Sequence, residues 1–161
     1  MVFGIRLPCH LVGLIVMSAA RKQFETQRDR DQEDEVIRQL DQKWKTTSRK
    51  LNPHWVVDFA VFRGEEVAAF VEVRCRSFEW GEFETVFCSV SKLTAAKRWF
   101  EWFDLPTLFV VMDRMGELRF CDLSKLDKLP IVIDGRNSKN MRDEWDQDLM
   151  VRIPNEKFQS L

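Results

Sequence analysis

Two acidic residues interrupt apolar segments of this 161-residue chain, where a charged side chain is unusual. Asp58 lies in the run WVVDFAVF, and Glu72 lies in AAFVEVRC. A carboxylate without a partner in a buried strand costs several kcal/mol. Arg74 follows Glu72 by two residues, and the alternation of a strand directs Glu72, Arg74 and Arg76 to one face. These charged residues are therefore the candidates for the chemistry of the protein.

The sequence around these residues predicts a β-hairpin. Residues 54–62 and 67–75 show a period of two, and Arg63-Gly64-Glu65-Glu66 supplies the turn between them. The expected register pairs Asp58 with Glu72, Ala60 with Phe70, and Phe62 with Ala68. Two acidic oxygens on adjacent strands are the usual way that a protein holds a hard cation such as Mg²⁺. A register shifted by one residue would turn Glu72 to the opposite face and exclude this site.

Further helices and strands are predicted on both sides of the hairpin. Residues 21–50 are charged and free of Pro and Gly, which predicts one long helix that Asn52-Pro53 stops. A second helix is expected from Ser89 or Ser91 to about Phe103. Four more segments have the composition of strands: 85–88, 107–112, 117–122 and 131–133. This order predicts an α/β fold in which a small central mixed β-sheet is flanked by helices.

Apolar residues at helical spacing predict which face of each helix is buried. In the first helix, the stripe consists of Val36, Ile37, Leu40, Trp44 and Leu51. Glu33 falls in line with this stripe, whereas Glu35 points well away from it. In the second helix, the expected inner face consists of Leu93, Ala96, Phe100 and Phe103.

Composition excludes several classes of protein. The 25 Lys and Arg residues against 26 Asp and Glu residues exclude a uniformly basic DNA-coating protein. The four cysteines form no C-x-x-C pair, so we interpret them as reduced thiols in a cytoplasmic protein rather than as zinc ligands. The longest apolar stretch is shorter than the roughly 18 residues of a membrane-spanning helix, so no membrane partner is expected.

The N-terminus permits two interpretations. Residues 1–16 are expected to be an extension upstream of a start at Met17, but Arg6, the apolar run 11–17 and the small residues 18–20 also resemble a short signal peptide. Residues 17–161 are expected to form a single domain. Its C-terminal part, from about residue 135, is polar and predicts an irregular tail.

The pattern of Asp58, thirteen residues and then Glu72-Val73-Arg74 resembles that of the PD-(D/E)XK (restriction-endonuclease-like) nuclease superfamily. In that superfamily, an acidic residue and an E-x-K tripeptide lie on neighbouring strands of a hairpin. The resemblance covers about residues 30–122 and includes the order of elements, an αβββαβ-like core. It is greatest to small phage-encoded and Holliday-junction-resolvase-like members.

The resemblance implies roles for individual residues. Asp58, Glu72 and the backbone carbonyl of Val73 would be ligands of Mg²⁺ or Mn²⁺. The helix carboxylate of the family would be Glu33, although Glu35 stays open. Arg74 stands where the family has Lys, and a guanidinium cannot act as a base because it stays protonated. Lys92, at the start of the second helix, is the candidate to replace that lysine.

The resemblance further implies a metal-dependent DNA phosphodiesterase, either an endonuclease or a resolvase-like enzyme. It would be phage-related, act in the cytoplasm of the bacterial host, and either stay monomeric or form a homodimer. Three cations are candidates for contacts to DNA phosphates: Arg76, Lys97 and Arg98. One alternative is a catalytically inactive module of nuclease fold that binds DNA or has a structural role, with Arg74 paired to a carboxylate. The other is an unrelated α/β protein that holds a buried ion pair.

Overall fold

The computed structural model describes residues 26–52, 55–135 and 147–161. The expected N-terminal extension, the first residues of the long helix and the polar segment 136–146 therefore lie outside the described residues. Within the described part of the chain, no helix is long and apolar enough to cross a membrane.

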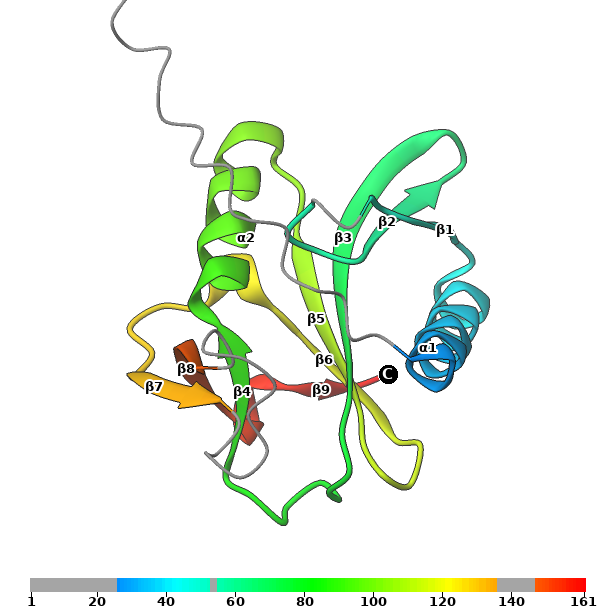
Figure 1. The fold of residues 1–161 in the computed structure, drawn as a ribbon. Coiled ribbons are helices and arrows are strands. Elements are labelled where there is room, and N and C mark those ends of the chain that lie inside the picture. Colours follow the sequence, from blue (N-terminus) through cyan, green and yellow to red (C-terminus); the bar gives the residue numbers. More distant parts are fainter. Residues whose placement is uncertain (1–25, 53–54, 136–146) are drawn as a thin grey trace, which may run out of the picture.

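A six-stranded sheet forms the centre of the fold (Figure 1). Strands β3 and β5 are parallel, while the other neighbouring pairs are antiparallel, so the sheet is mixed as predicted. In spatial order the strands are β1 (Thr47–Lys50), β2 (Phe59–Arg63), β3 (Glu66–Cys75), β5 (Thr107–Met112), β6 (Leu118–Asp122) and β9 (Gln159–Ser160).

The two helices, α1 (Gln27–Trp44) and α2 (Val90–Phe103), lie on opposite sides of this sheet (Figure 1). The α1 side buries Val36, Ile37 and Leu40 of the predicted stripe, and Trp44 packs against the same core. From the sheet, Val71 and Val73 belong to the same α1-side core. The α2 side has its own core, in which Ala96 packs with Phe109 and Val111. The expected α/β architecture, with a helix on each side of a mixed sheet, is confirmed.

The irregular C-terminal tail expected from about residue 135 is wrong for residues 147–160, which form two strands and a short helix, while residues 136–146 lie outside the described part of the chain. A second sheet of three strands lies on the α2 side, in the order β4 (Thr85–Ser89), β8 (Gln147–Pro154) and β7 (Ile131–Gly135). Val151 and Ile153 of β8 are buried in the α2-side core, since the sequence DLMVRIP alternates with a period of two. The short helices η1 (Leu123–Lys125) and η2 (Asn155–Lys157) follow β6 and β8.

Helix α1 begins at Gln27 and ends at Trp44, so it is shorter than the predicted 21–50 at both ends. Thr26 caps its start in a capping box with Asp29. The helix ends at Trp44 because Lys45 adopts the left-handed conformation. The Asp41 side chain then accepts hydrogen bonds from the Thr46 hydroxyl at 2.9 Å and from the backbone and hydroxyl of Ser48. These bonds turn the chain into β1, which sequence periodicity does not indicate.

Helix α2 begins as predicted, with Ser89 as its N-cap, but it presents a different face to the sheet. Ala96 and Trp99 are buried, whereas the expected core residues Phe100 and Phe103 are 37% and 55% exposed. The helix is rotated because Trp99 packs on Phe70, with 4.5 Å between the ring centroids. Of the aromatic residues near the end of α2, only Trp99 is buried core.

The predicted hairpin register holds at the end that carries the acidic residues. Phe59 pairs with Val71, and the amide of Asp58 donates to the carbonyl of Val71 at 3.1 Å. A shift between Val61 and Phe62 then places Phe62 opposite Val67, so the expected pairing of Phe62 with Ala68 is wrong. This irregularity lies towards the turn and leaves Asp58 opposite Glu72.

Candidate metal and DNA-cleavage site

Asp58 and Glu72 lie on the α2 side of the sheet. Glu72 aligns with Phe109 of the α2-side core and alternates with Val71 and Val73, which face α1. The backbone amide of Val73 donates to Asp58 Oδ2 at 3.0 Å and fixes that carboxylate next to β3. The hairpin therefore places the two carboxylates side by side, as the sequence predicts.

Glu72 is 1% exposed and has two cationic partners. Arg74 Nη2 lies 2.6 Å from Oε1, and Lys92 Nζ lies 2.6 Å from Oε2. Burial raises the pKa of the Glu72 carboxyl to about 7, and the charge of Asp58 acts in the same direction while Arg74 and Lys92 oppose it. The structure thus brings four of the predicted residues together in one cluster: Asp58, Glu72, Arg74 and Lys92.

Lys92 reaches Glu72 because it lies on the inner stripe of α2. Ala96 follows Lys92 by four residues and Trp99 by seven, so all three face the sheet. The Lys92 side chain is 17% exposed, and its ammonium donates a hydrogen bond to Glu72. A lysine from a neighbouring helix therefore lies beside the carboxylate that precedes Arg74.

The oxygen atoms of this cluster fit a hard divalent cation. Asp58 and Glu72 supply carboxylates, and Val73 supplies a backbone carbonyl, which are the ligand types that Mg²⁺ and Mn²⁺ prefer. Glu72 Oε1 is buried and accepts no well-aligned hydrogen bond from the described residues. The described part of the chain contains no group of three His, Cys, Asp or Glu side chains that could hold a metal. The protein would thus supply two carboxylates and a carbonyl, and water and substrate would complete the coordination.

Glu33 lies on α1, which covers the other side of the sheet. Its Oε2 pairs with Lys50 Nζ at 2.8 Å, and its side chain is only 15% exposed. Its charge acts on Arg74 and Cys75, which places it near the end of β3. Glu35 instead faces solvent, where hydrogen bonds from Arg38 and Gln39 lower its pKa to about 2.

Glu33 and Glu35 lie on the same helix in different surroundings, so they form a matched pair for mutation. We expect Glu33→Gln to weaken divalent-metal affinity about two- to tenfold, because it removes a negative charge that acts on Arg74 from the α1 side of the sheet. Calorimetric titration with Mn²⁺ measures this change. Glu35→Gln is the control and is expected to leave the affinity unchanged. The opposite ranking of the two variants would assign the helix carboxylate to Glu35.

The three candidate DNA contacts occupy different surroundings. Arg76 Nη2 donates to the carbonyl of Phe87 at 2.9 Å, so it connects the end of β3 to β4. Burial lowers the pKa of Arg76. Lys97 pairs with Asp127 at 2.6 Å, and Arg98 lies over the ring of Trp102. Lys97 and Arg98 are turned about 140° and 120° from Lys92 around the helix, so they point away from the carboxylates.

Sequence reasoning missed Cys88 as a neighbour of the cluster. This residue lies on β4, one residue before the N-cap of α2, and is 3% exposed. Burial raises the pKa of its thiol to about 12, and Glu72 contributes to the shift. A neutral thiol is a poor ligand for Mg²⁺, so Cys88 contributes an apolar wall. No spacing in the sequence links β4 to β3.

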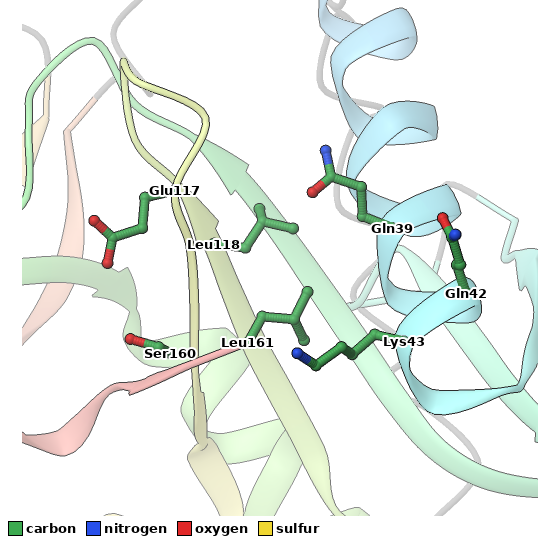
Figure 2. A pocket seen from close by; sticks show the side chains of 7 residues that line it. All are labelled: Gln39, Gln42, Lys43, Glu117, Leu118, Ser160 and Leu161. Atoms are coloured by element: carbon green, nitrogen blue, oxygen red, sulfur yellow. The ribbon is translucent and has the colours of Figure 1, made fainter.

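A surface hollow lies elsewhere, between α1, the start of β6 and the C-terminal residues 160–161 (Figure 2). It has a volume of about 590 Å³ and is lined by Gln39, Gln42, Lys43, Glu117, Leu118, Ser160 and Leu161. It contains neither paired carboxylates nor any residue of the cluster. The chemistry therefore favours the Asp58–Glu72 cluster as the functional site.

Comparisons with known proteins identify the family and the fold of the chain. A sequence profile described as "Phage putative PDDEXK endonuclease" matches residues 19–161. Among solved structures, the chain is similar to Archaeoglobus fulgidus Hjc, a Holliday junction resolvase from an archaeal hyperthermophile. The TM-score is 0.52 at 9% sequence identity, with 83% of this chain and 90% of that chain covered. A comparison with curated protein sequences found no match.

Proposed function

The chain belongs to the family of phage PDDEXK endonucleases, and from this premise we propose that it hydrolyses DNA phosphodiester bonds with a divalent cation held by Asp58 and Glu72. The observation that carries the proposal is the cluster itself. Two carboxylates share one face of the hairpin, and the Lys92 ammonium contacts one of them at 2.6 Å. Resolvases and endonucleases of this fold act on DNA, so the proposed substrate is DNA.

Each residue of the cluster has a proposed task. Asp58, Glu72 and the Val73 carbonyl would hold Mg²⁺ or Mn²⁺, which supplies Lewis-acid polarisation of the phosphate and activation of water. The amide of Val73 orients Asp58 through its hydrogen bond. Lys92 is the proposed group that positions the attacking water. It is also the proposed proton-transfer group of the site, because a lysine ammonium can give up a proton whereas the Arg74 guanidinium cannot. Arg74 would stabilise negative charge on the phosphate.

One observation supports a second candidate function, a nuclease-fold protein that binds DNA without cutting it. Glu72 has two cations within 2.6 Å, so its charge is compensated by the chain itself. In such a protein, the cluster would be a structural ion-pair network. The two functions differ in whether the purified protein binds divalent metal at the cluster.

A cleavage assay tests the proposed activity. We expect the protein to cut DNA in the presence of Mg²⁺ or Mn²⁺ and to lose this activity when EDTA removes the metal. Duplex, flap and four-way-junction substrates, compared at equal concentration, would identify the DNA structure that it prefers. DNA binding without cleavage of any of these substrates under either metal would favour the inactive module.

The place of action and the assembly are also proposals. The phage family of the chain supports action in the cytoplasm of a bacterial host. If four-way junctions are the preferred substrate, we propose that the protein acts as a homodimer, because such a junction presents equivalent strands to the active sites of two protomers. Light scattering with and without junction DNA would measure the assembly.

A further inference from the structure

Arg74 covers two of the three oxygen atoms that would bind the metal. Its Nη2 lies 2.6 Å from Glu72 Oε1, and its Nη1 donates to the carbonyl of Val73 at 3.3 Å. The planar fork of a guanidinium can make both contacts at once, which a single ammonium group does less well. In the described structure, Arg74 therefore contacts the ligand atoms that the metal would need.

The charges of the cluster are balanced in this arrangement. When both carboxylates are ionised, the two negative charges of Asp58 and Glu72 match the two positive charges of Arg74 and Lys92. A divalent cation added to this set would leave two positive charges uncompensated at a buried position, which is unfavourable. If Arg74 moves out of the cluster, one positive charge remains in excess, and one DNA phosphate would neutralise it.

We propose that Arg74 occupies the cation position in the free protein and moves to a DNA phosphate when substrate binds, so that DNA binding and metal binding are coupled through this side chain. The inference rests on the metal site of the proposed function. Arg74 would then determine when the cluster accepts a metal, in addition to any role in stabilising charge on the phosphate. Because coupling free energies are reciprocal, bound metal would strengthen DNA binding by the same factor.

The exposures of the cluster residues favour Arg74 over Lys92 as the group that moves. The Arg74 side chain is 41% exposed, compared with 17% for Lys92 and 1% for Glu72. A side chain that is partly open to solvent can reach a phosphate by rotation about its own bonds. Lys92 contacts the other oxygen of Glu72, Oε2, and can keep this contact while Oε1 becomes available.

Calorimetric titration with Ca²⁺ tests the coupling without requiring turnover. We expect free Arg74→Gln protein to bind Ca²⁺ about tenfold or more tightly than the free wild type. Adding a duplex oligonucleotide is expected to raise the Ca²⁺ affinity of the wild type by a similar factor and that of Arg74→Gln much less. Arg114→Gln is the control for net charge. Arg114 lies on the turn between β5 and β6 and pairs with exposed Glu79. This variant is expected to behave like the wild type.

Two results would contradict the inference, and they differ in what they say of the metal site. Equal Ca²⁺ affinities of wild type and Arg74→Gln, with no effect of DNA, would overturn the coupling and leave the metal site standing. No Ca²⁺ binding by either protein, with or without DNA, would overturn the metal site as well. If Arg74→Gln fails to fold in a thermal unfolding scan, Arg74→Lys takes its place. Its single ammonium should also raise Ca²⁺ affinity in the free protein, and an unchanged affinity would overturn the coupling.

Discussion

Asp58→Asn is expected to lower single-turnover DNA cleavage by about a thousandfold or more. The reason is that a metal ion supplies several kcal/mol of transition-state stabilisation, and an amide oxygen is a much weaker ligand than a carboxylate. The fold should survive, because the Asn oxygen can still accept the Val73 amide hydrogen that Asp58 Oδ2 accepts at 3.0 Å. Rapid-quench cleavage and calorimetric Mn²⁺ binding measure the two losses.

Asp127→Asn is the matched control for Asp58→Asn. It makes the same chemical change in an exposed carboxylate that pairs with Lys97, away from the cluster. We expect its cleavage rate and its metal affinity to equal those of the wild type. If Asp58→Asn cleaves as fast as this control, the metal does not bind where the carboxylates meet, and the proposed site is wrong.

Lys92→Ala is expected to lower single-turnover cleavage by about 10²- to 10⁴-fold, the usual contribution of general acid–base catalysis. The same change should lower the free energy of unfolding by about 1–3 kcal/mol, because buried Glu72 loses a charged hydrogen-bond donor. Chemical denaturation measures this stability loss separately from the rate. The separation matters because Arg74 still neutralises Glu72 in the variant and should keep it folded.

Two further variants decide what Lys92 contributes. Lys125→Ala removes an exposed lysine that pairs with Asp122, so we expect little change in rate or stability. Lys92→Arg keeps the charge beside Glu72 but replaces a group that can deprotonate by one that cannot. Restored stability with a low rate would support proton transfer by Lys92. Full restoration of the rate by Arg would contradict that role and leave only an electrostatic one.

The sequence by itself determined the hairpin and the positions of its acidic residues. Alternation within a strand is a local property, and a shift of one residue would have turned Val71 and Val73 away from the α1-side core and Glu72 towards it. The register near Asp58 was therefore fixed by the hydrophobic pattern. The stripe of Val36, Ile37 and Leu40 determined in the same way which side of α1 packs on the sheet. The α/β architecture followed from these local patterns and their order, whereas the expectation of a nuclease came from the resemblance of Asp58 and Glu72-Val73-Arg74 to a known superfamily.

The partners of each charge were decided only by the tertiary structure. Lys92 meets Glu72 because α2 is rotated to bury Trp99 against Phe70, whereas helical spacing alone favoured a face with Phe100 and Phe103. Strands β8 and β9 became visible only through their pairing with other strands: β8 lies between β4 and β7, and β9 pairs with β6. Periodicity reports which side of a helix or strand is apolar. Contacts between distant elements depend instead on the packing of the whole core, and the chemistry of this site lies in those contacts.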